Sequence, residues 1–270
     1  MEGKVVLVTG STDGLGREVA LRLGAAGANV IVHGRNAARG AAIVAAITGQ
    51  GRGRARFYQA DLASLAAVGQ LAENILRDYD RLDVLVNNAG IWISTGERQV
   101  SADGHELHFA VNYLSGYVLT RLLLPRLLES APSRIVNVAS GAQSPIDFAD
   151  VMLARPGRAR EGYAQSKLAQ IMFTFDLARE LEGSAVTVAA LHPATMMDTT
   201  MVRASGMPAQ SSVDEGARAV MNLVEGERIE SGAFYDGLRP ARAHRQAYDE
   251  KARATLRRLS ADLTGLDRTP

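Results

Sequence analysis

The sequence contains no cysteine. This excludes disulfides, thiol nucleophiles and thiolate metal ligands, although it does not by itself assign a compartment. A run of about 18 apolar residues is also missing, so we expect no membrane span. The first residues, MEGKVVLVTG, lead directly into a strand pattern and lack the basic region, apolar core and cleavage site of a signal peptide. We therefore expect a cytoplasmic protein with no membrane partner.

An excess of charge of either sign is missing too. The 30 Lys and Arg residues are balanced by 29 Asp and Glu, which leaves a formal net charge of +1. No long-range field therefore favours nucleic acid or an acidic membrane as a partner. The 270 residues are 47% hydrophobic and 22% charged, which is ordinary for a globular protein with a sizeable core. This length fits one large α/β domain.

Short apolar runs alternate with longer amphipathic segments along the whole chain. The patterns predict strands at 4–10, 29–34, 54–61, 82–90, 134–140, 185–193 and 232–237. They predict helices at 16–27, 37–49, 64–79, 103–130, 162–182, 213–225 and 241–261. Such alternation is typical of right-handed β-α-β units with helices on both faces of a sheet. We expect an α/β fold, a single doubly wound Rossmann domain over 1–270, with a mostly parallel seven-stranded sheet in the order 3-2-1-4-5-6-7.

Two segments have no clean period. The segment 141–161 contains two prolines and is interpreted as an insertion that forms a loop. The segment 194–212 mixes Met, Thr, Gly and Pro, and we interpret it as a lid over a fairly apolar substrate pocket. Its methionines would supply an adaptable lining, namely Met196, Met197, Met201 and Met207.

A glycine-rich turn lies between the first predicted strand and helix, within VLVTGSTDGLGREVA at 6–20. Its glycines follow the spacing G-x-x-x-G-x-G rather than the better-known G-x-G-x-x-G. Such a loop lets the backbone approach a pyrophosphate, and the helix N-terminus presents free N–H groups to it. We predict a dinucleotide site here; the alternative is a tight turn without a ligand. The predicted contacts are Gly10, Ser11, Thr12, Gly14, Leu15 and Gly16.

Several motifs resemble those of the short-chain dehydrogenase/reductase family. TGSTDGLG resembles its T-G-x-x-x-G-x-G loop, NNAG at 87–90 its strand-four motif, VNYLSG at 111–116 the helix with its functional Asn, and YAQSK at 163–167 its Y-x-x-x-K motif. The motifs appear in the family's order between about 4 and 237. The resemblance implies a Rossmann fold, a nicotinamide cofactor and oxidoreductase activity. It also implies further cofactor contacts, namely Asp61, Leu62, Asn88, Ala89 and Gly90.

The end of the second predicted strand bears on the choice of cofactor. An acidic residue there would bind the ribose 2′-OH and favour NAD. Gly34 occupies that position and Arg35 follows. An arginine can bind a 2′-phosphate through a charge-assisted, bidentate pair, so we expect NADP(H) over NAD(H), with Arg35 and Asn36 as contacts and Arg39 in support. Alternatively, Arg35 is a solvated loop charge. Asp13 in the glycine loop opposes the NADP interpretation, since some NADP-dependent family members carry a basic residue there.

Tyr163 and Lys167 lie four residues apart, so a helix would place them on one face, one turn apart. A neighbouring ammonium favours the phenolate and lowers the pKa of tyrosine from ~10, which suits the pair for acid–base chemistry on a carbonyl or alcohol. The resemblance adds three roles. Ser140 would orient the substrate oxygen, Asn112 would hold a proton-relaying water, and Lys167 would also bind the nicotinamide ribose. The alternative is an ordinary pair on a helix face.

One motif departs from the family. After the sixth strand the family commonly has Pro-Gly and then a Thr that contacts the nicotinamide carboxamide, whereas this sequence has HPATMMDTT at 192–200. Pro193 is kept and Ala194 replaces the glycine. We include Pro193 and Thr195 among the predicted cofactor contacts, although Thr195 and Thr199 both remain candidates for the carboxamide contact.

The remaining polar and aromatic candidates carry weaker signals. His105 and His108 have helical i, i+3 spacing, but nothing nearby completes a ligand set, so we predict no metal site. His192 is interpreted as structural. Trp92 and Ile93, just after NNAG, either line the substrate pocket or pack in the interior.

Together these features predict an NADP-dependent oxidoreductase. It would transfer hydride reversibly between NADPH and a ketone or aldehyde, a small-molecule substrate of fairly apolar character, with Tyr163 as the general acid/base. Ser140 and Tyr163 are 23 positions apart, a long connection that resembles the retinol-dehydrogenase-like and bacterial ketoreductase-like branches. One alternative is a non-catalytic NADP-binding sensor or regulator. A sugar epimerase is another, but it would need a larger C-terminal substrate domain.

Two predicted helices bear on assembly. The stretches YVLTRLLLPRLL and LAQIMFTFDL are apolar around much of the helix, which is typical of buried helices. Family members pair these two helices into a four-helix interface, so the resemblance implies a homodimer or homotetramer. Alternatively, the 141–161 insertion covers that surface and leaves a monomer.

Overall fold

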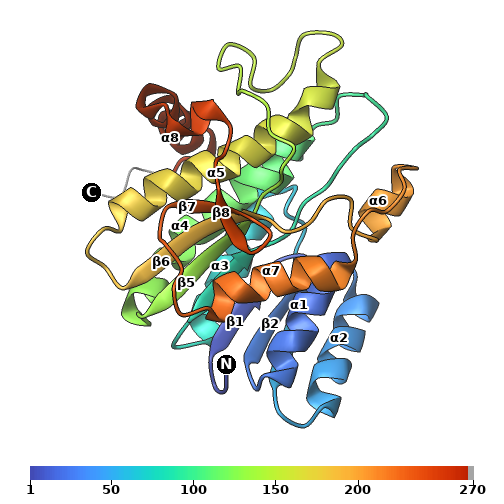
Figure 1. Ribbon diagram of the computed structural model, residues 1–270, viewed down its shortest axis with the longest axis vertical. Helices are drawn as coiled ribbons and strands as arrows, with labels where there is room; N and C mark the ends of the chain where they lie inside the picture. Colours follow the sequence, from blue (N-terminus) through green and yellow to red (C-terminus); the bar gives the residue numbers. More distant parts are fainter. Residues whose placement is uncertain (267–270) are drawn as a thin grey trace.

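The computed structural model describes residues 1–266, and within them one sheet runs through the molecule (Figure 1). Its strand order is β3-β2-β1-β4-β5-β6-β7-β8. All neighbouring strands are parallel except β7 and β8. The strands are β1 (Val5–Val8), β2 (Asn29–Gly34), β3 (Arg54–Gln59), β4 (Val84–Asn87), β5 (Ser133–Val138), β6 (Val186–His192), β7 (Ala233–Asp236) and β8 (Arg239–Ala241).

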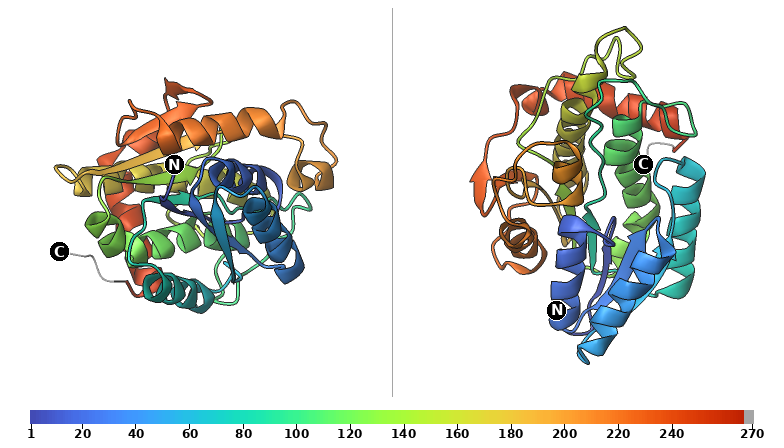
Figure 2. Two further views of the ribbon diagram at one scale, coloured as in Figure 1. Left: turned by 90° about the horizontal axis from the view of Figure 1, so that it is seen from below. Right: turned by 90° about the vertical axis from the view of Figure 1, so that its right-hand side faces the viewer.

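Helices cover both faces of this sheet, which confirms the predicted doubly wound α/β architecture (Figures 1 and 2). One face is covered by α1 (Gly14–Ala25), α2 (Ala37–Gly49) and α7 (Val213–Glu225). The other is covered by α3 (Leu65–Asp78), α4 (Ser115–Glu129) and α5 (Gly162–Glu180), with α8 (Glu250–Thr264) outside α5. Shorter helices are the π-helix η1 (Phe109–Leu114), η2 (Ala159–Glu161), α6 (Thr200–Ala204) and η3 (Arg245–Tyr248).

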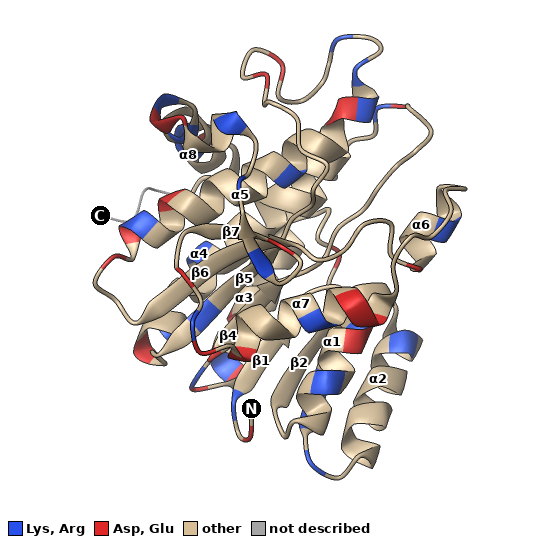
Figure 3. Ribbon diagram, viewed as in Figure 1, with Lys and Arg blue, Asp and Glu red and all other residues tan. Residues whose placement is uncertain are grey.

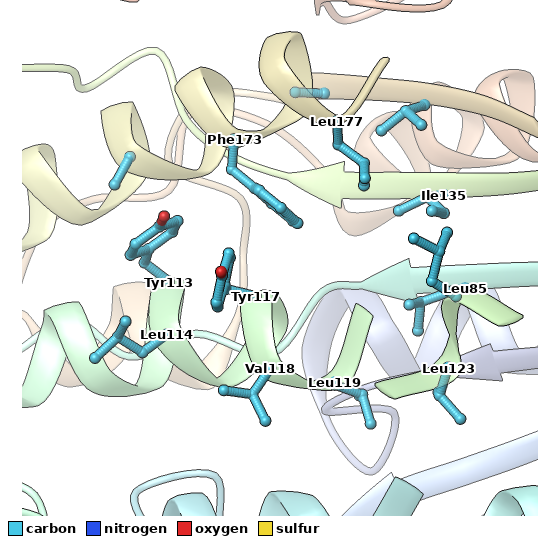
Figure 4. Packing of buried hydrophobic residues seen from close by; sticks show 14 of the residues in the cluster. Leu85, Tyr113, Leu114, Tyr117, Val118, Leu119, Leu123, Ile135, Phe173 and Leu177 are labelled. Atoms are coloured by element: carbon cyan, nitrogen blue, oxygen red, sulfur yellow. The ribbon is translucent and has the colours of Figure 1, made fainter. Parts of the chain in front are cut away.

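The core follows from the alternation of side chains along each strand. Leu7 of β1 packs in the cluster under α3, α4 and α5, whereas its neighbours Val6 and Val8 pack under α1, α2 and α7. Figure 4 shows the first cluster from close by, with Tyr117 and Phe173 facing each other between α4 and α5. Helices and apolar side chains cover both faces of the sheet, which explains why the strand sequences are continuous apolar runs.

The predicted number of seven strands is wrong, because an eighth strand follows the seventh. β8 is antiparallel to β7 across the two-residue loop Gly237-Leu238. Gly237 has φ +57°, as the first loop position of such a hairpin requires. Pro240 and Arg239 are exposed, so this edge strand has no apolar pattern to reveal it. The Asp236-Gly237 pair was the available hairpin signal.

Two predicted helices also begin later than their patterns indicate. The helix predicted at 103–130 begins after a turn, since Ala102–His105 is irregular and η1 starts at Phe109. The tail predicted as a helix at 241–261 contains the end of β8 and a 3-10 turn before α8 begins at Glu250. The start of α8 is specified by capping, since Asp249 accepts from the N–H groups of Lys251 and Ala252.

α8 is fixed to α5 and η1 by buried polar contacts. The Tyr113 hydroxyl lies 2.7 Å from Ser260 Oγ, and both groups are buried. Because Ser260 donates to the Leu256 carbonyl, the phenol donates to the serine. Asp176 of α5 pairs with Arg253 and Arg257 of α8. α8 therefore occupies part of the α5 surface that the predicted four-helix interface would use.

Charged residues are dispersed over the surface, with both signs intermixed on the helices (Figure 3). Within residues 1–266, no helix is both long and apolar enough to cross a membrane.

We expect Tyr113→Phe to lower the free energy of unfolding by about 1 kcal/mol, because Ser260 loses a buried hydrogen-bond donor. Urea denaturation followed by circular dichroism measures this. Tyr248→Phe is the comparison variant, since this residue is 43% exposed and its hydroxyl takes part only in a solvent-exposed hydrogen bond from the Ala243 N–H, and the change should alter stability by less than about 0.5 kcal/mol. Equal effects of the two substitutions would contradict the assigned role of the Tyr113 hydroxyl.

Candidate active site

The glycine loop joins β1 to α1 in a conformation that side chains would block. Gly10 has φ +64° and Gly14 has φ +50°. A Cβ on Gly16 would lie 2.3 Å from the Gly10 carbonyl oxygen, so the start of α1 packs directly on the loop. The first N–H groups of α1 have no intrahelical acceptor. This close backbone cradle at a helix N-terminus fits the pyrophosphate of a dinucleotide.

His33 of β2 holds the loop in place, a role that its sequence pattern did not reveal. Its Nδ1 accepts from the Gly10 N–H at 3.1 Å, and Ser11 Oγ accepts from the His33 N–H at 2.9 Å. Burial lowers the pKa of His33 to about 4, so the ring is neutral at neutral pH and Nδ1 stays an acceptor. Two residues of the phosphate loop are therefore tied to β2.

Asp13, the acidic residue of the glycine loop, caps helix α1 and pairs with Arg39. Its Oδ1 caps α1 by accepting from the Gly14 N–H at 2.8 Å. Its Oδ2 pairs with Arg39 at 3.2 Å, which offsets the negative charge beside the loop. Both side chains are exposed, so the pair contributes little to stability.

Gly34 at the end of β2 packs closely against the glycine loop. A Cβ on Gly34 would lie 2.6 Å from the side chain of Thr12, so any larger residue there would require Thr12 to move. Arg35 follows with an exposed side chain. Asn36 caps α2 through its Oδ1, which accepts from the Arg39 N–H. Of the two predicted contacts for a 2′-phosphate, Arg35 has no acidic partner within residues 1–266, and Asn36 also serves as a cap.

Two predicted cofactor contacts, Asp61 and Leu62, are divided between surface and core. Asp61 is exposed, and its Oδ1 accepts from the Ala63 N–H at 3.1 Å. Leu62 is 5% exposed and packs in the core. Its side chain therefore supports the strand end rather than facing solvent.

The NNAG segment after β4 packs against the glycine loop. Asn88 Nδ2 donates to the Thr9 carbonyl at 2.8 Å, and Ala89 lies 3.0 Å from the Cβ position of Gly10. A Cβ on Gly90 would lie 3.3 Å from Asn112 Oδ1 and 3.4 Å from Lys167 Nζ. This segment thus links the phosphate loop to the predicted catalytic residues.

The 194–212 segment lies over the same loop. Thr199 Cγ2 lies 3.2 Å from the Cβ position of Gly14, and Thr199 caps α6. Thr195 Oγ1 is 3.1 Å from His192 Nε2 at the end of β6. The methionine lining is only partly as expected, since Met197 packs against α7 at Gly216 and Met207 is 47% exposed.

Ser140 and Tyr163 meet at the carboxyl end of β5. Ser140 follows the strand, and its side chain lies near the hydroxyl of Tyr163, the second residue of α5. Burial raises the pKa of Tyr163, and the nearby Ser140 side chain opposes that rise. The sequence-based expectation of a lowered tyrosine pKa is therefore wrong for the chain alone.

The physical reason lies in the direction of the Lys167 side chain. Nζ is 5.8 Å from the centre of the Tyr163 ring and donates to the Val138 carbonyl and to Gln170 Oε1, both at 2.9 Å. Burial lowers the pKa of Lys167 to about 7. An amino group that is partly deprotonated and points into the interior gives the phenolate form of Tyr163 little stabilisation.

Asn112 lies in the π-helix η1, where the widened turn brings its side chain toward the strand ends. Its Oδ1 accepts from the Ile91 N–H at 2.7 Å, and Nδ2 donates to Ser166 Oγ at 2.9 Å and to the Ile91 carbonyl at 3.1 Å. The Asn112 amide is therefore fully used by protein groups. It lines a small internal cavity together with Thr9, Asn87 and Gln170.

The comparisons with known proteins agree with this geometry. A sequence model described as short chain dehydrogenase matches residues 4–209. This chain belongs to the short chain dehydrogenase family. Retinol dehydrogenase 13 of Mus musculus is 36% identical over 285 residues, covering 98% of this chain and 84% of the relative. Retinol dehydrogenase 11 of Homo sapiens is 36% identical over 279 residues, covering 98% and 87%.

Solved structures give the same result. A short chain dehydrogenase from Burkholderia cenocepacia in complex with NADP has a TM-score of 0.70 at 31% identity, covering 87% of this chain and 96% of that one. The chain is therefore a retinol-dehydrogenase-like oxidoreductase of this family, which acts on a small molecule with a nicotinamide cofactor.

A buried polar chain leads inward from this dehydrogenase's lysine, and sequence reasoning missed it. Thr174 Oγ1 donates to the main-chain carbonyl of Gln170, whose side chain binds the lysine. Asn137 Nδ2 donates to Thr174 Oγ1, and Asn87 Nδ2 donates to Asn137 Oδ1, with all three distances between 2.8 and 2.9 Å. All four side chains are at most 4% exposed. Polar residues at interior helix and strand positions were the available signal.

No group of three or more His, Asp or Glu residues within 1–266 is arranged to hold a metal ion. The predicted helical pairing of His105 and His108 is wrong, since His105 lies in the turn before η1. His108 is instead buried against Glu106, with Nδ1 and Oε1 2.7 Å apart.

Burial of Lys167 predicts a pH-dependent stability. Its folded-state pKa of about 7 lies below its ordinary value of 10.5, so between these values the unfolded chain holds a proton that the folded chain lacks. Stability from this group therefore rises with pH, by at most about 1.4 kcal/mol per pH unit. Urea unfolding of the unmodified protein and of Lys167→Met at pH 7, 8 and 9 measures the effect. The stability of the unmodified protein relative to Lys167→Met should increase with pH, and a constant difference would contradict the desolvated ammonium.

Proposed function

We propose that this dehydrogenase transfers hydride reversibly between NADPH and a ketone or aldehyde. The observation that carries the proposal is the grouping of Ser140, Tyr163 and Lys167 at the carboxyl end of β5, the sheet edge that also holds the glycine loop, with Lys167 Nζ 5.8 Å from the centre of the Tyr163 ring. Carboxyl ends of parallel strands are where such sites gather. When bound, the nicotinamide supplies or accepts the hydride.

The chain's own residues supply the proton chemistry. Because burial raises the pKa of Tyr163, its hydroxyl is protonated at neutral pH and serves as the donor when a carbonyl is reduced. Ser140 orients the substrate oxygen toward that hydroxyl. Lys167, with a pKa of about 7, can carry or release a proton near neutral pH. Asn112 lines the cavity beside Gln170, and a water there would connect the site to the buried polar chain.

The cofactor contacts follow from the loops at this edge. The glycine loop would hold the pyrophosphate through Gly10, Ser11, Thr12, Gly14, Leu15 and Gly16. Arg35 and Asn36 would bind the 2′-phosphate, because the guanidinium can form a charge-assisted pair with it and Gly34 carries no carboxylate that would repel it. The adenine and nicotinamide ends would be contacted by Asp61, Leu62, Asn88, Ala89, Gly90, Tyr163, Lys167, Pro193 and Thr195. The NADP complex of the Burkholderia cenocepacia structure supports this preference.

The substrate proposal is a fairly apolar carbonyl or alcohol. Relatives are named retinol dehydrogenases, and retinol is an apolar alcohol. The 194–212 segment would close over the substrate as a lid. A non-catalytic sensor is disfavoured because all four proposed catalytic residues are present, namely Asn112, Ser140, Tyr163 and Lys167.

Oligomeric state and cellular location stay predictions. A homodimer or homotetramer through α4 and α5 would have to accommodate α8, which lies on α5. The 141–161 segment also stays assigned as an insertion. A cytoplasmic location is expected.

We expect Tyr163→Phe to lower kcat by about 10²- to 10⁴-fold, because the reaction loses its proton donor. NADPH oxidation with a panel of ketones and aldehydes measures this. NADPH binding by fluorescence titration should persist and serves as the control. Undiminished turnover in the variant would overturn the proposed mechanism, and a panel with no turnover by the unmodified protein would favour the sensor.

Arg35→Ala tests the cofactor preference. Loss of a charge-assisted contact should weaken NADPH binding by about 10- to 100-fold and leave NADH binding nearly unchanged. Isothermal titration with both cofactors measures the two affinities. Arg52→Ala is the matched control, since this exposed arginine lies beyond the other end of α2. Equal affinity of the unmodified protein for both cofactors would contradict the NADP assignment.

A further inference from the structure

A half-buried tryptophan lies beside the proposed proton donor. The ring centres of Trp92 and Tyr163 are 6.0 Å apart with planes tilted by 45°. Trp92 lies near the start of the stretch 91–99, which follows the NNAG segment. The later residues of this stretch are mostly exposed. Trp92 is also the only tryptophan of the chain.

Backbone hydrogen bonds on both sides of Trp92 fix its position. The Ile91 N–H donates to Asn112 Oδ1 at 2.7 Å, and the Ile93 N–H donates to His108 Nε2 at 3.0 Å. Two side chains at the start of η1 therefore hold the residues before and after the indole. The 91–93 backbone cannot shift without losing one of these bonds.

His108 is held in turn by Glu106. Because Nε2 accepts from Ile93, the ring proton is on Nδ1, which donates to Glu106 Oε1 at 2.7 Å. The second carboxylate oxygen accepts from the Phe109 N–H at 2.8 Å. The ring therefore has one tautomer and one orientation.

The same pair contacts the start of α5. The His108 ring packs edge-on against Tyr163, with centres 6.4 Å apart and planes at 86°. A Cβ on Gly162 would lie 2.8 Å from both Glu106 Oε1 and His108 Nδ1. Tyr163 is thus contacted by His108 on one side and by Trp92 on another.

Stability alone gives a weak reason for this pair. Glu106 and His108 are 2% and 3% exposed, and a buried polar or ionic pair is often no more stable than well-packed apolar residues of similar volume. What apolar residues would not supply is the acceptor for Ile93 and hence the fixed position of Trp92.

We propose that Glu106 and His108 are positioning residues that hold the Trp92 indole beside Tyr163 as one wall of the substrate site. An indole face favours flat π systems, so this wall selects carbonyl compounds with an aromatic or conjugated group next to the carbonyl. The proposal rests on the carbonyl-reductase function proposed above and names its substrate class.

Trp92→Leu tests the wall. The ratio of kcat/KM for benzaldehyde to that for cyclohexanecarbaldehyde should fall by about 3- to 10-fold, the size expected of one aromatic pair. Comparing ratios between variant and unmodified protein cancels the different reactivities of the two carbonyl groups. An unchanged ratio overturns the selective wall.

A matched pair of histidine variants tests the positioning. In His108→Gln the amide oxygen can replace Nε2 as the acceptor for Ile93, whereas in His108→Asn the amide nitrogen can replace only Nδ1. Emission of the sole tryptophan reports on residue 92 without any turnover. We expect His108→Asn to shift this emission to longer wavelength and to increase its quenching by acrylamide. The same variant should lower the ratio of kcat/KM for benzaldehyde to that for cyclohexanecarbaldehyde, as Trp92→Leu does. His108→Gln should stay close to the unmodified protein in all three measurements.

Identical emission, quenching and substrate ratio in the two histidine variants and the unmodified protein would overturn the positioning role. Equal loss in both histidine variants would also overturn it, because it would indicate a packing role of the ring. If a histidine variant fails to fold, Glu106→Gln replaces it, since its amide cannot accept from both Phe109 and His108 and should mimic His108→Asn. If the unmodified protein reduces no carbonyl, the proposed function fails, whereas the fluorescence comparison still decides the positioning.

Discussion

The buried amino group of Lys167 joins helix α5 to the end of strand β5. Its partners are the last carbonyl of β5 and Gln170 of its own helix, and a chain of buried amides and hydroxyls continues from there into the sheet. Each of these groups is costly to leave unpaired, so each fixes the position of the next. The rotation of α5, the end of β5 and the register of β4 against β5 therefore depend on one another.

The candidate site is a consequence of that arrangement. Because the lysine fixes α5 against β5, Tyr163 one turn earlier is brought to Ser140 at the strand end. The same sheet edge carries the glycine loop, which His33 ties to β2. The Glu106–His108 pair also reaches this site, because the His108 ring packs edge-on against Tyr163. The lysine network and this pair thus both limit the movement of the elements around the tyrosine, which favours the fixed geometry that acid–base chemistry requires.

Most of the fold could be predicted, because a doubly wound sheet is specified by local patterns. The predicted bounds of β2 and α2 coincide with the structure, since an apolar run and a capping Asn define them. β8 could not be found this way, because its three residues are exposed or half-exposed and its pairing is imposed by β7. The start of η1 was missed because the residues before it, Ala102–His105, form a turn despite their helical spacing.

For the candidate site, the sequence by itself determined which residues are the candidates, because Gly10, Ser140, Tyr163 and Lys167 stand in recognisable motifs after strands or on one helix face. Only the tertiary structure decided how they are charged and held. The direction of Lys167 and the burial of Tyr163 depend on β5 and Gln170, and so the expected lowering of the tyrosine pKa is reversed. The roles of His33, Glu106 and His108 likewise come from contacts between separate segments, because a hydrogen bond depends on distance and not on spacing along the chain.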